Sequence, residues 1–310
     1  MAAITAKMVK ELREETGAGM MECKKALAET NGNIEEAIEF LRKNGQAKAE
    51  KKASRIAAEG LCLVANDGDK KAVVVEVNSE TDFVASNEKF QTYVKEVAAH
   101  ALNSSAADID GFLAEKWDDA KTVQEQLVEE ISVIGEKLSI RRFERVCEEN
   151  GFVVSYTHGN GRISVLVDAE CAVVNDEAKE AVHNIAMQIA ALNPKYLSDK
   201  DVDQEFIAHE TEIIKAQIEN DPKESQKPEK VKEGMIKGRI NKELKEVCLL
   251  DQPYVKATDG KQNVAKYIEE VSKQIGAPLT LKKFVRFETG EGMEKKNEDF
   301  AAEVAAQING

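Results

Sequence analysis

The feature that most constrains the fold is an internal repeat of a strand, a turn, a second strand and a helix. Residues 60–68 and 151–159 both read as the first strand of a hairpin, and β-branched apolar runs follow at 72–77 and 162–167. Such runs are typical of strands at the centre of a sheet. The helices that follow carry apolar residues 88 positions apart, in one register: Phe90, Val94, Val97, Ala98 and Ala101, then Ala178, Val182, Ile185, Ala186 and Ile189. The repeat predicts an α+β fold with a duplicated core and antiparallel sheets.

The two copies differ in the loop between the second strand and the helix. The strands align at an offset of 90 residues and the helices at 88, so the second loop is predicted to be two residues shorter. The first loop contains Thr81, Asp82, Phe83 and Val84, an acid and a large aromatic at the end of a buried strand, where binding groups usually lie. In the second copy the corresponding segment is residues 171–174, which contain neither an acid nor an aromatic. Asp82 and Phe83 are therefore predicted to bind a partner, and the alternative, that Phe83 folds back over its own sheet, is disfavoured.

Composition and charge limit the class of protein. With 310 residues, 42% of them hydrophobic, two or three domains with real cores are expected. The net charge of −14 argues against nonspecific binding to nucleic acid or to an anionic membrane and favours a partner with a basic face. No run approaches the ~20 apolar residues of a membrane span, and residues 1–7 lack the apolar core of a signal peptide. A cytoplasmic location is expected.

Three short amphipathic helices are predicted at the N-terminus, separated by residues 16–19 and 31–33 and ending at 43–45. The basic stretch from Lys48 to Arg55 then reads as a solvated helical connector. RNA binding is the alternative for this stretch, but it lacks the aromatic side chains on which bases stack.

A long helical hairpin is predicted after residue 195. Its seam is expected at spacings of four and three, formed by Val202, Phe206, His209, Ile213 and Ala216 and, on the returning arm, by Val231, Met235, Ile240, Leu244 and Val247. Beyond the turn at 290–292, a last helix is expected to be capped near Asn297 and to bury Phe300 and Val304. The expected division is a helical domain with its connector at 1–56, a first core subdomain at 57–145, a second at 146–195 and 251–289, the hairpin at 196–250 and a C-terminal module at 290–310.

Several apparent chemical motifs fail. The glycines of 17–19 lack the strand and third glycine of a dinucleotide fingerprint, and no phosphate loop exists, so no direct nucleotide binding is predicted. The acids between 199 and 210 match a calcium loop except at Gln204, where glycine is needed. A nucleophilic pair of Cys171 and His183 stays open, without support beyond residue identity. The chain is expected to be no enzyme, with no catalytic residues, metal or cofactor.

Four spaced motifs carry a resemblance to a known family. Residues 16–27 (TGAGMMECKKAL), 80–85 (ETDFVA), 286–295 (RFETGEGMEK) and 299–305 (DFAAEVA) are similar to bacterial elongation factor Ts, the guanine-nucleotide exchange factor of elongation factor Tu. The resemblance runs the full length. It implies a ubiquitin-associated-like N-terminal domain, a duplicated α+β core, an inserted antiparallel coiled-coil hairpin and a C-terminal helical module.

The resemblance also implies roles for individual residues. Asp82 and Phe83, flanked by Thr81 and Val84, would approach the Mg²⁺ side of the partner's nucleotide pocket, where disturbing the metal and phosphate contacts releases GDP during translation elongation.

Further partner contacts are implied elsewhere in the chain. Arg13, Met20 and Met21 would contact a helix of the partner's nucleotide domain. Both methionines also stand at core spacing, so one of them could contact the partner while the other packs in the core. His158 would help the second copy to hold another domain of the partner. The alternative function is a non-catalytic adaptor that docks through its helical domain and arm.

Overall fold

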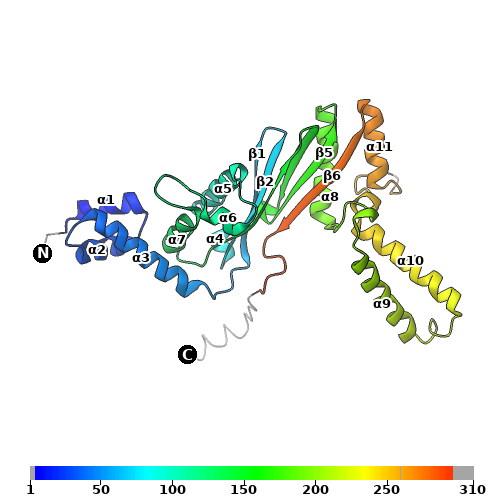
Figure 1. The fold of residues 1–310 in the computed structure, drawn as a ribbon, viewed down its shortest axis with the longest axis horizontal. Coiled ribbons are helices and arrows are strands. Elements are labelled where there is room, and N and C mark those ends of the chain that lie inside the picture. Colours follow the sequence, from blue (N-terminus) through cyan, green and yellow to red (C-terminus); the bar gives the residue numbers. More distant parts are fainter. Residues whose placement is uncertain (1–3, 259, 296–310) are drawn as a thin grey trace.

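Two small antiparallel sheets form the centre of the molecule (Figure 1). The structure is a computed structural model that describes residues 4–258 and 260–295. In this part of the chain the strand orders are β1-β2-β3 and β4-β5-β6, so the two apolar runs, β2 and β5, are central as predicted. The strands are β1 (Glu59–Asp67), β2 (Lys71–Ser79), β3 (Ser139–Cys147), β4 (Gly151–His158), β5 (Ile163–Cys171) and β6 (Leu279–Glu288). The predicted α+β class is confirmed.

An equivalent helix packs on the first two strands of each sheet. Helix α5 (Glu88–Asn103) packs on β1 and β2, and α8 (Asp176–Leu192) packs on β4 and β5. All ten apolar residues predicted for these helices are buried. They meet alternate residues of the central strands: Val73, Val75 and Val77 in the first core and Val165, Val167 and Ala169 in the second. Burial of a large apolar side chain stabilises a fold by roughly 1.5–3 kcal/mol, so each copy has a substantial core of its own.

The other faces of the two sheets pack against each other. Their contact buries Cys62, Ala72, Val74 and Val146 from the first sheet against Leu166, Val285 and Phe287 from the second. Each central strand is therefore covered on both faces, which explains why its sequence is continuously apolar rather than alternating.

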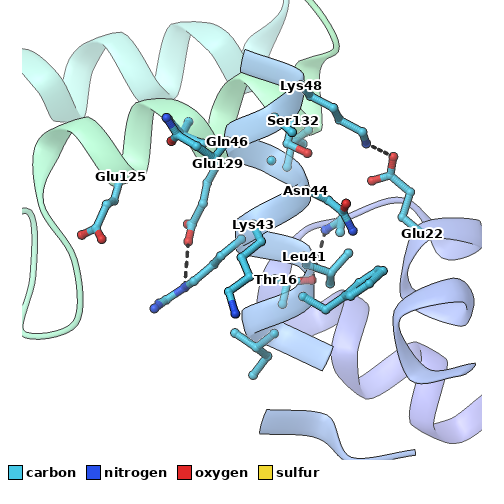
Figure 2. A pocket seen from close by; sticks show the side chains of 18 of the residues that line it. Thr16, Glu22, Leu41, Lys43, Asn44, Gln46, Lys48, Glu125, Glu129 and Ser132 are labelled. Atoms are coloured by element: carbon cyan, nitrogen blue, oxygen red, sulfur yellow. Dashed lines mark hydrogen bonds and ion pairs between the residues drawn. The ribbon is translucent and has the colours of Figure 1, made fainter. Parts of the chain in front are cut away.

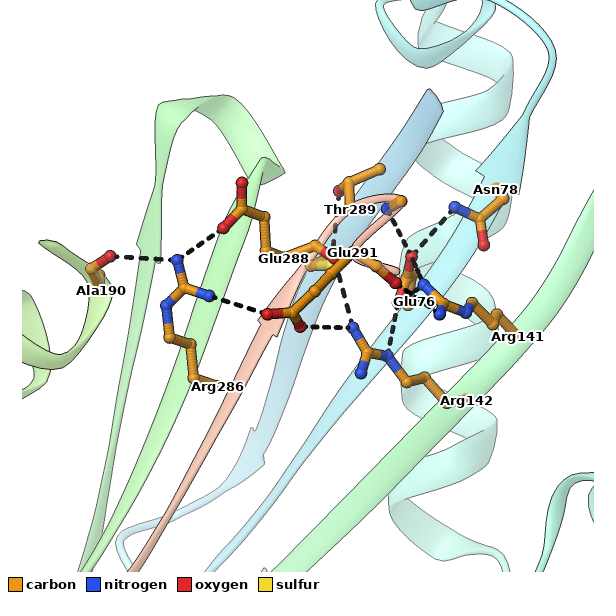
Figure 3. A network of polar contacts seen from close by, with 11 residues as sticks. Glu76, Asn78, Arg141, Arg142, Ala190, Arg286, Glu288, Thr289 and Glu291 are labelled. Atoms are coloured by element: carbon orange, nitrogen blue, oxygen red, sulfur yellow. Dashed lines mark hydrogen bonds and ion pairs between the residues drawn. The ribbon is translucent and has the colours of Figure 1, made fainter. Parts of the chain in front are cut away.

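A buried carboxylate joins the two sheets at one end of this contact (Figure 3). Glu76 on β2 has no exposed surface, and its oxygens accept hydrogen bonds from Arg142 Nε at 2.6 Å, Arg141 Nη1 at 3.0 Å and Asn78 Nδ2 at 3.1 Å. The backbone N–H of Gly290, just after β6, donates to the same carboxylate at 2.8 Å. A buried charge is tolerated when it is paired and hydrogen-bonded in this way.

The pairing register corrects the predicted alignment of the copies. Each central strand pairs with a bulged neighbour: Arg141 of β3 is the extra residue next to Glu76, and Lys282 of β6 is the extra residue next to Asp168. Aligning the two bulges shows that equivalent positions of β2 and β5 differ by 92 residues rather than 90. The segment from strand to helix therefore has eight residues in the first copy, 80–87, and four in the second, 172–175. A shift of two residues along a strand leaves every side chain on the same face, so the apolar pattern could not reveal it.

Three helices form the N-terminus as predicted: α1 (Ala6–Thr16), α2 (Met20–Glu29) and α3 (Ile34–Lys52). The predicted end of the module at 43–45 is wrong, because α3 runs through this stretch to Lys52. Gly45 is buried against α7 (Val123–Ile134), and a Cβ there would lie 3.7 Å from Val128 and Ser132. This glycine permits two helices to approach closely instead of ending one.

The predicted helical hairpin is present, and its predicted seam is confirmed near the base, where Val202, Phe206, Leu244 and Val247 pack together. Farther along the first helix the seam is shifted by one residue. Helices α9 (Gln204–Asn220) and α10 (Glu229–Val247) pack on each other, and α9 buries Ile214 and Ile218, whereas His209, Ile213 and Ala216 are exposed. On the returning arm Val231 is also exposed. Ile207, Ile214 and Ile218 form a second stripe on α9, and Ile214 and Ile218 are its buried members.

The remaining helices are short, apart from α11. They are α4 (Asp82–Ala85), α6 (Ile109–Ala114), α11 (Val264–Ile275) and the 3₁₀ turns η1 (Gly159–Gly161), η2 (Asp199–Asp201) and η3 (Leu249–Asp251). The predicted last helix with Phe300 and Val304 lies outside the described residues. Within the described ranges, no helix is both long and apolar enough to cross a membrane.

Candidate partner-binding site

The segment after β2 holds Phe83 out into solvent. Thr81 caps the single-turn helix α4, and its Oγ1 accepts a hydrogen bond from the Val84 N–H at 3.3 Å. Val84 and Ala85 pack on the core under α5, whereas Asp82 and Phe83 point outward. Phe83 is 85% exposed. The alternative in which Phe83 folds back over its own sheet is therefore wrong.

The exposed ring of Phe83 is apolar surface that the fold leaves unburied. Single exposed apolar residues are common, but a fully exposed phenylalanine on a capped turn is costly to hydrate and ready to be buried by a partner. Its burial in a complex would contribute roughly 2 kcal/mol. Asp82 lies beside it and adds a negative charge to the same tip.

The loop that carries Phe83 is anchored from behind by Glu136, which follows α7. The Glu136 carboxylate accepts hydrogen bonds from the backbone N–H groups of Glu80 and Thr81, both at 3.1 Å, and from Thr81 Oγ1 at 2.7 Å. Glu80 in turn accepts from the Lys137 N–H at 2.6 Å and from Arg55 Nη1 at 3.1 Å. Sequence analysis missed Glu136, because no local pattern links it to a loop 55 residues earlier.

The corresponding loop of the second copy is short and simpler. Cys171 occupies the place of Ser79, and both donate to the carbonyl two residues on: Ser79 Oγ to Thr81 at 3.0 Å and Cys171 Sγ to Val173 at 3.2 Å. Val173 is 37% exposed, less than half the exposed fraction of Phe83. The shared hydrogen bond belongs to the scaffold, whereas the exposed aromatic belongs to the first copy alone.

The predicted contact residues of the N-terminal helices also face outward. Met20 is 59% exposed and Met21 is 74% exposed, and Arg13 is exposed in the last turn of α1. The expectation that one methionine packs in the core is wrong, because the buried stripe of α2 begins at Cys23. Both thioethers are therefore free to contact another protein, and flexible Met side chains suit such surfaces.

His158 lies at the end of β4, on a third surface. It is exposed, and its Nδ1 lies 2.8 Å from Tyr156 Oη. The Tyr156 ring also meets His183 edge-on, with centroids 5.4 Å apart. The predicted site residues thus stand on three elements, the N-terminal helices, the β2–α5 loop and the β4–β5 hairpin, as expected of a protein that contacts a large partner at several places.

The suggested nucleophilic pair is not formed. His183 packs on Tyr156, which pairs with Val165, whereas Cys171 lies six residues further along β5, roughly 20 Å away. Among the described residues, no group of three or more His, Cys, Asp or Glu side chains could hold a metal ion.

A groove of about 600 Å³ lies beside the contact between α3 and α7, and residues of α1 and α2 also line it (Figure 2). Two ion pairs cross it: Lys48 of α3 with Glu22 of α2, and Arg42 of α3 with Glu129 of α7 at 3.8 Å. Because these pairs connect α3 with its neighbours on both sides, we interpret the groove as the boundary between packed helices.

Comparison with known proteins identifies the family. The family model described as "Elongation factor TS" matches residues 80–291. A Clostridium perfringens protein named elongation factor Ts is 54% identical over 303 residues, which cover 97% of this chain and 98% of the relative. Proteins of the same name from Clostridium novyi and Clostridioides difficile are each 50% identical over 309 residues, 99% of this chain and 99% and 100% of theirs.

These matches place the chain among the elongation factors of protein biosynthesis, which act in translation. The chain belongs to the elongation factor Ts family. The match begins at Glu80, so the anchored loop with Asp82 and Phe83 lies inside the region that the family model covers.

Proposed function

We propose that this protein is a guanine-nucleotide exchange factor for elongation factor Tu, in which Phe83 and Asp82 disturb the Mg²⁺ and phosphate side of the nucleotide pocket. The observation that carries the proposal is the 85% exposure of Phe83 on an anchored turn. Because the turn already holds the ring outward, little conformational entropy is lost when the ring enters a partner. The free energy of burying the ring is then available to displace groups of the partner.

The physical requirement for exchange is a difference in affinity. A GTPase holds its nucleotide through backbone amides, a lysine and a Mg²⁺ ion, and release means weakening that hold. An exchange factor binds the nucleotide-free GTPase more tightly than the loaded one, and by linkage nucleotide and factor weaken each other equally. A thousandfold acceleration of release corresponds to a barrier lower by about 4 kcal/mol.

In this proposal Phe83 wedges between partner side chains near the Mg²⁺ ion, and Asp82 makes polar contacts beside it. Thr81 and Val84 hold the turn: Thr81 as its cap and Val84 through its contact with the core. The protein itself binds no nucleotide and performs no covalent chemistry.

Binding is distributed over the other exposed residues. Arg13, Met20 and Met21 would contact the partner's nucleotide domain, and His158 another of its domains. The finer architecture belongs to the same proposal: residues 1–56 as a ubiquitin-associated-like docking domain, 57–145 and 146–195 with 251–289 as the two core subdomains, 196–250 as a coiled-coil arm and 290–310 as a C-terminal module.

The test is stopped-flow release of a fluorescent GDP analogue from elongation factor Tu. The native chain is expected to accelerate release, and Phe83→Ala to remove most of the acceleration while Met21→Ala mainly raises the concentration needed for half of the effect. If the native chain binds elongation factor Tu but leaves release unchanged, the adaptor alternative holds instead.

A further inference from the structure

We infer that Glu136 is a positioning residue for nucleotide exchange, which acts by fixing the loop that presents Phe83. The inference rests on the proposed function and adds to it a residue that does not itself reach the partner's nucleotide. Figure 1 shows α7, which precedes Glu136, lying next to α4, the turn that carries Phe83.

The hydrogen bonds of Glu136 converge on the base of the loop. Three donors meet one carboxylate: the N–H groups of Glu80 and Thr81 and the hydroxyl of Thr81, at 2.7–3.1 Å. Thr81 is also the cap of α4, whose second residue is Phe83. Fixing the cap residue therefore fixes the direction in which the Phe83 ring leaves the surface. Charge-assisted bonds of this kind are the strong ones in proteins.

A second layer of contacts holds Glu136 itself in place. The Lys137 N–H donates to Glu80 at 2.6 Å, and Lys137 Nζ donates to the Arg55 carbonyl at 2.7 Å. Arg55 returns to Glu80 through Nη1 at 3.1 Å. The turn after α7, the loop after β2 and the connector after α3 are thus tied into one unit. Arg55 thus connects the stretch after the N-terminal helices with the loop that carries Phe83.

The second copy lacks this arrangement. Its four-residue loop is capped by Asn175, whose side chain accepts from Ala178 N–H at 2.9 Å, and no carboxylate from another element reaches its backbone in the described residues. Of the two equivalent loops, only the one that carries an exposed aromatic has an anchoring carboxylate from another element. The second copy closes without such a carboxylate, which favours orientation of Phe83 as the role of Glu136.

The experiment measures GDP-analogue release from elongation factor Tu at saturating factor, and the factor concentration that gives half of the maximal rate. Glu136→Ala is expected to lower the maximal rate about tenfold, because misplacement of a positioned group costs rate even when binding is kept. The half-maximal concentration should change little. Glu136→Gln should lie between, since its amide oxygen still accepts hydrogen bonds.

A matched control exists in the same subdomain. The Glu115 carboxylate also accepts from two backbone N–H groups and a hydroxyl, those of Ser105, Ala106 and Ser105 Oγ, at 3.1–3.3 Å, in a loop away from Phe83. Glu115→Ala removes as many hydrogen bonds and should leave the maximal rate within about twofold of the native rate.

A double variant separates positioning from general damage. In the Phe83→Ala background, adding Glu136→Ala should lower the rate by less than about twofold, because residues that act through one another are not additive. A further tenfold loss in that background, or a native maximal rate for Glu136→Ala alone, would overturn the inference.

Amide hydrogen exchange tests the same claim without the partner. Glu136→Ala should speed exchange of the Glu80 and Thr81 amides at least tenfold while the β2 amides stay protected. Unchanged protection of the loop overturns the positioning role. A different outcome separates the two claims. If Glu136→Ala speeds amide exchange in the loop but the native chain does not accelerate GDP release, the positioning role of Glu136 stands and only the proposed function is overturned.

Discussion

The two copies of the core unit reach their helices by different routes. The first takes eight residues from β2 to α5 and exposes Phe83 on the way, and the second takes four from β5 to α8. The strands, bulges and helix cores are otherwise equivalent, down to the hydrogen bonds of Ser79 and Cys171. The second copy therefore serves as an internal control: it shows that the fold closes without the four extra residues, so these are available for contact with a partner.

The buried carboxylates at the two bulges give a second contrast. Glu76 is fully hydrogen-bonded by Arg141, Arg142 and Gly290, whereas its equivalent, Asp168, has a buried Oδ1 without a hydrogen-bond partner in the described residues. Both copies therefore have a carboxylate next to the bulge, but only the first copy has the hydrogen-bond donors that satisfy it. One copy uses this position to join the sheets, and the other does not.

Exchanging the loops should produce the largest effect. Replacing residues 80–87 by the four residues 172–175 should abolish the acceleration of GDP release, a loss of up to about a thousandfold or 4 kcal/mol. The fold should survive with a cost of about 1–2 kcal/mol from the buried surface of Ala85 and Val84. Stopped-flow release and circular dichroism measure the two quantities. An exchange-active chimera would show that the first loop is not the site.

Removing Glu76 should be the next largest effect, and it concerns stability. Glu76→Ala leaves Arg141 and Arg142 without their shared carboxylate, at about 30% side-chain exposure, so the free energy of unfolding should fall by about 3 kcal/mol. Urea denaturation measures the change. Asp168→Ala, at the equivalent position, serves as the control and should cost far less. Equal losses would contradict the contrast between the copies.

The ionised side chain of Asp168 should lower the free energy of unfolding at neutral pH. Burial, and then the neighbouring carboxylate of Glu148, raise the pKa of Asp168 from its ordinary value near 3.8 to about 6, against the opposing charges of Lys282 and Lys283. Because the folded pKa lies above the unfolded one, the native state binds more protons in this window, and stability falls as the pH rises from about 4 to about 6.

The corresponding test is Asp168→Asn. This variant should be more stable than the native chain at pH 7, by on the order of 1 kcal/mol, and the gain should vanish near pH 4. Urea denaturation at the two pH values measures it. A gain of the same size at both would show that the titration of Asp168 is not its origin.

The smallest effect is expected for Cys171→Ser. Serine stands at the equivalent position of the first copy and makes the same hydrogen bond, so the free energy of unfolding should change by less than about 0.5 kcal/mol. The rate of GDP release should not change at all. A loss of release activity would revive a chemical role for this thiol.

Sequence periodicity predicted the core, but not every register. Every apolar position assigned to α5 and α8 is buried, because a helix repeats its buried face at a spacing that few other patterns share. The hairpin helix α9 carries two apolar stripes with equal spacing, one through Phe206 and Ile213 and one through Ile207 and Ile214. No local sequence feature distinguishes the two stripes. Contact with α10 determines which of them is buried.

The candidate site was predicted in its exposed part only. The exposure of Asp82 and Phe83 could be predicted because the second copy lacks them, and a repeat shows which residues packing requires. Glu136 could not be found, since its hydrogen bonds to the loop depend on where α7 ends in space. A residue that only one copy exposes can be recognised in a repeat, whereas a residue that supports it from another element cannot.

The hydrogen bond from Gly290 to Glu76 has a consequence for how the chain is made. It joins residues 214 positions apart, and the turn that supplies it follows β6, the last strand of the second sheet. During synthesis from the N-terminus, the first sheet therefore emerges long before this partner of its buried carboxylate. Contacts of such long sequence separation form late and slowly. The first copy therefore completes its hydrogen bonding only after the chain has been translated through Gly290.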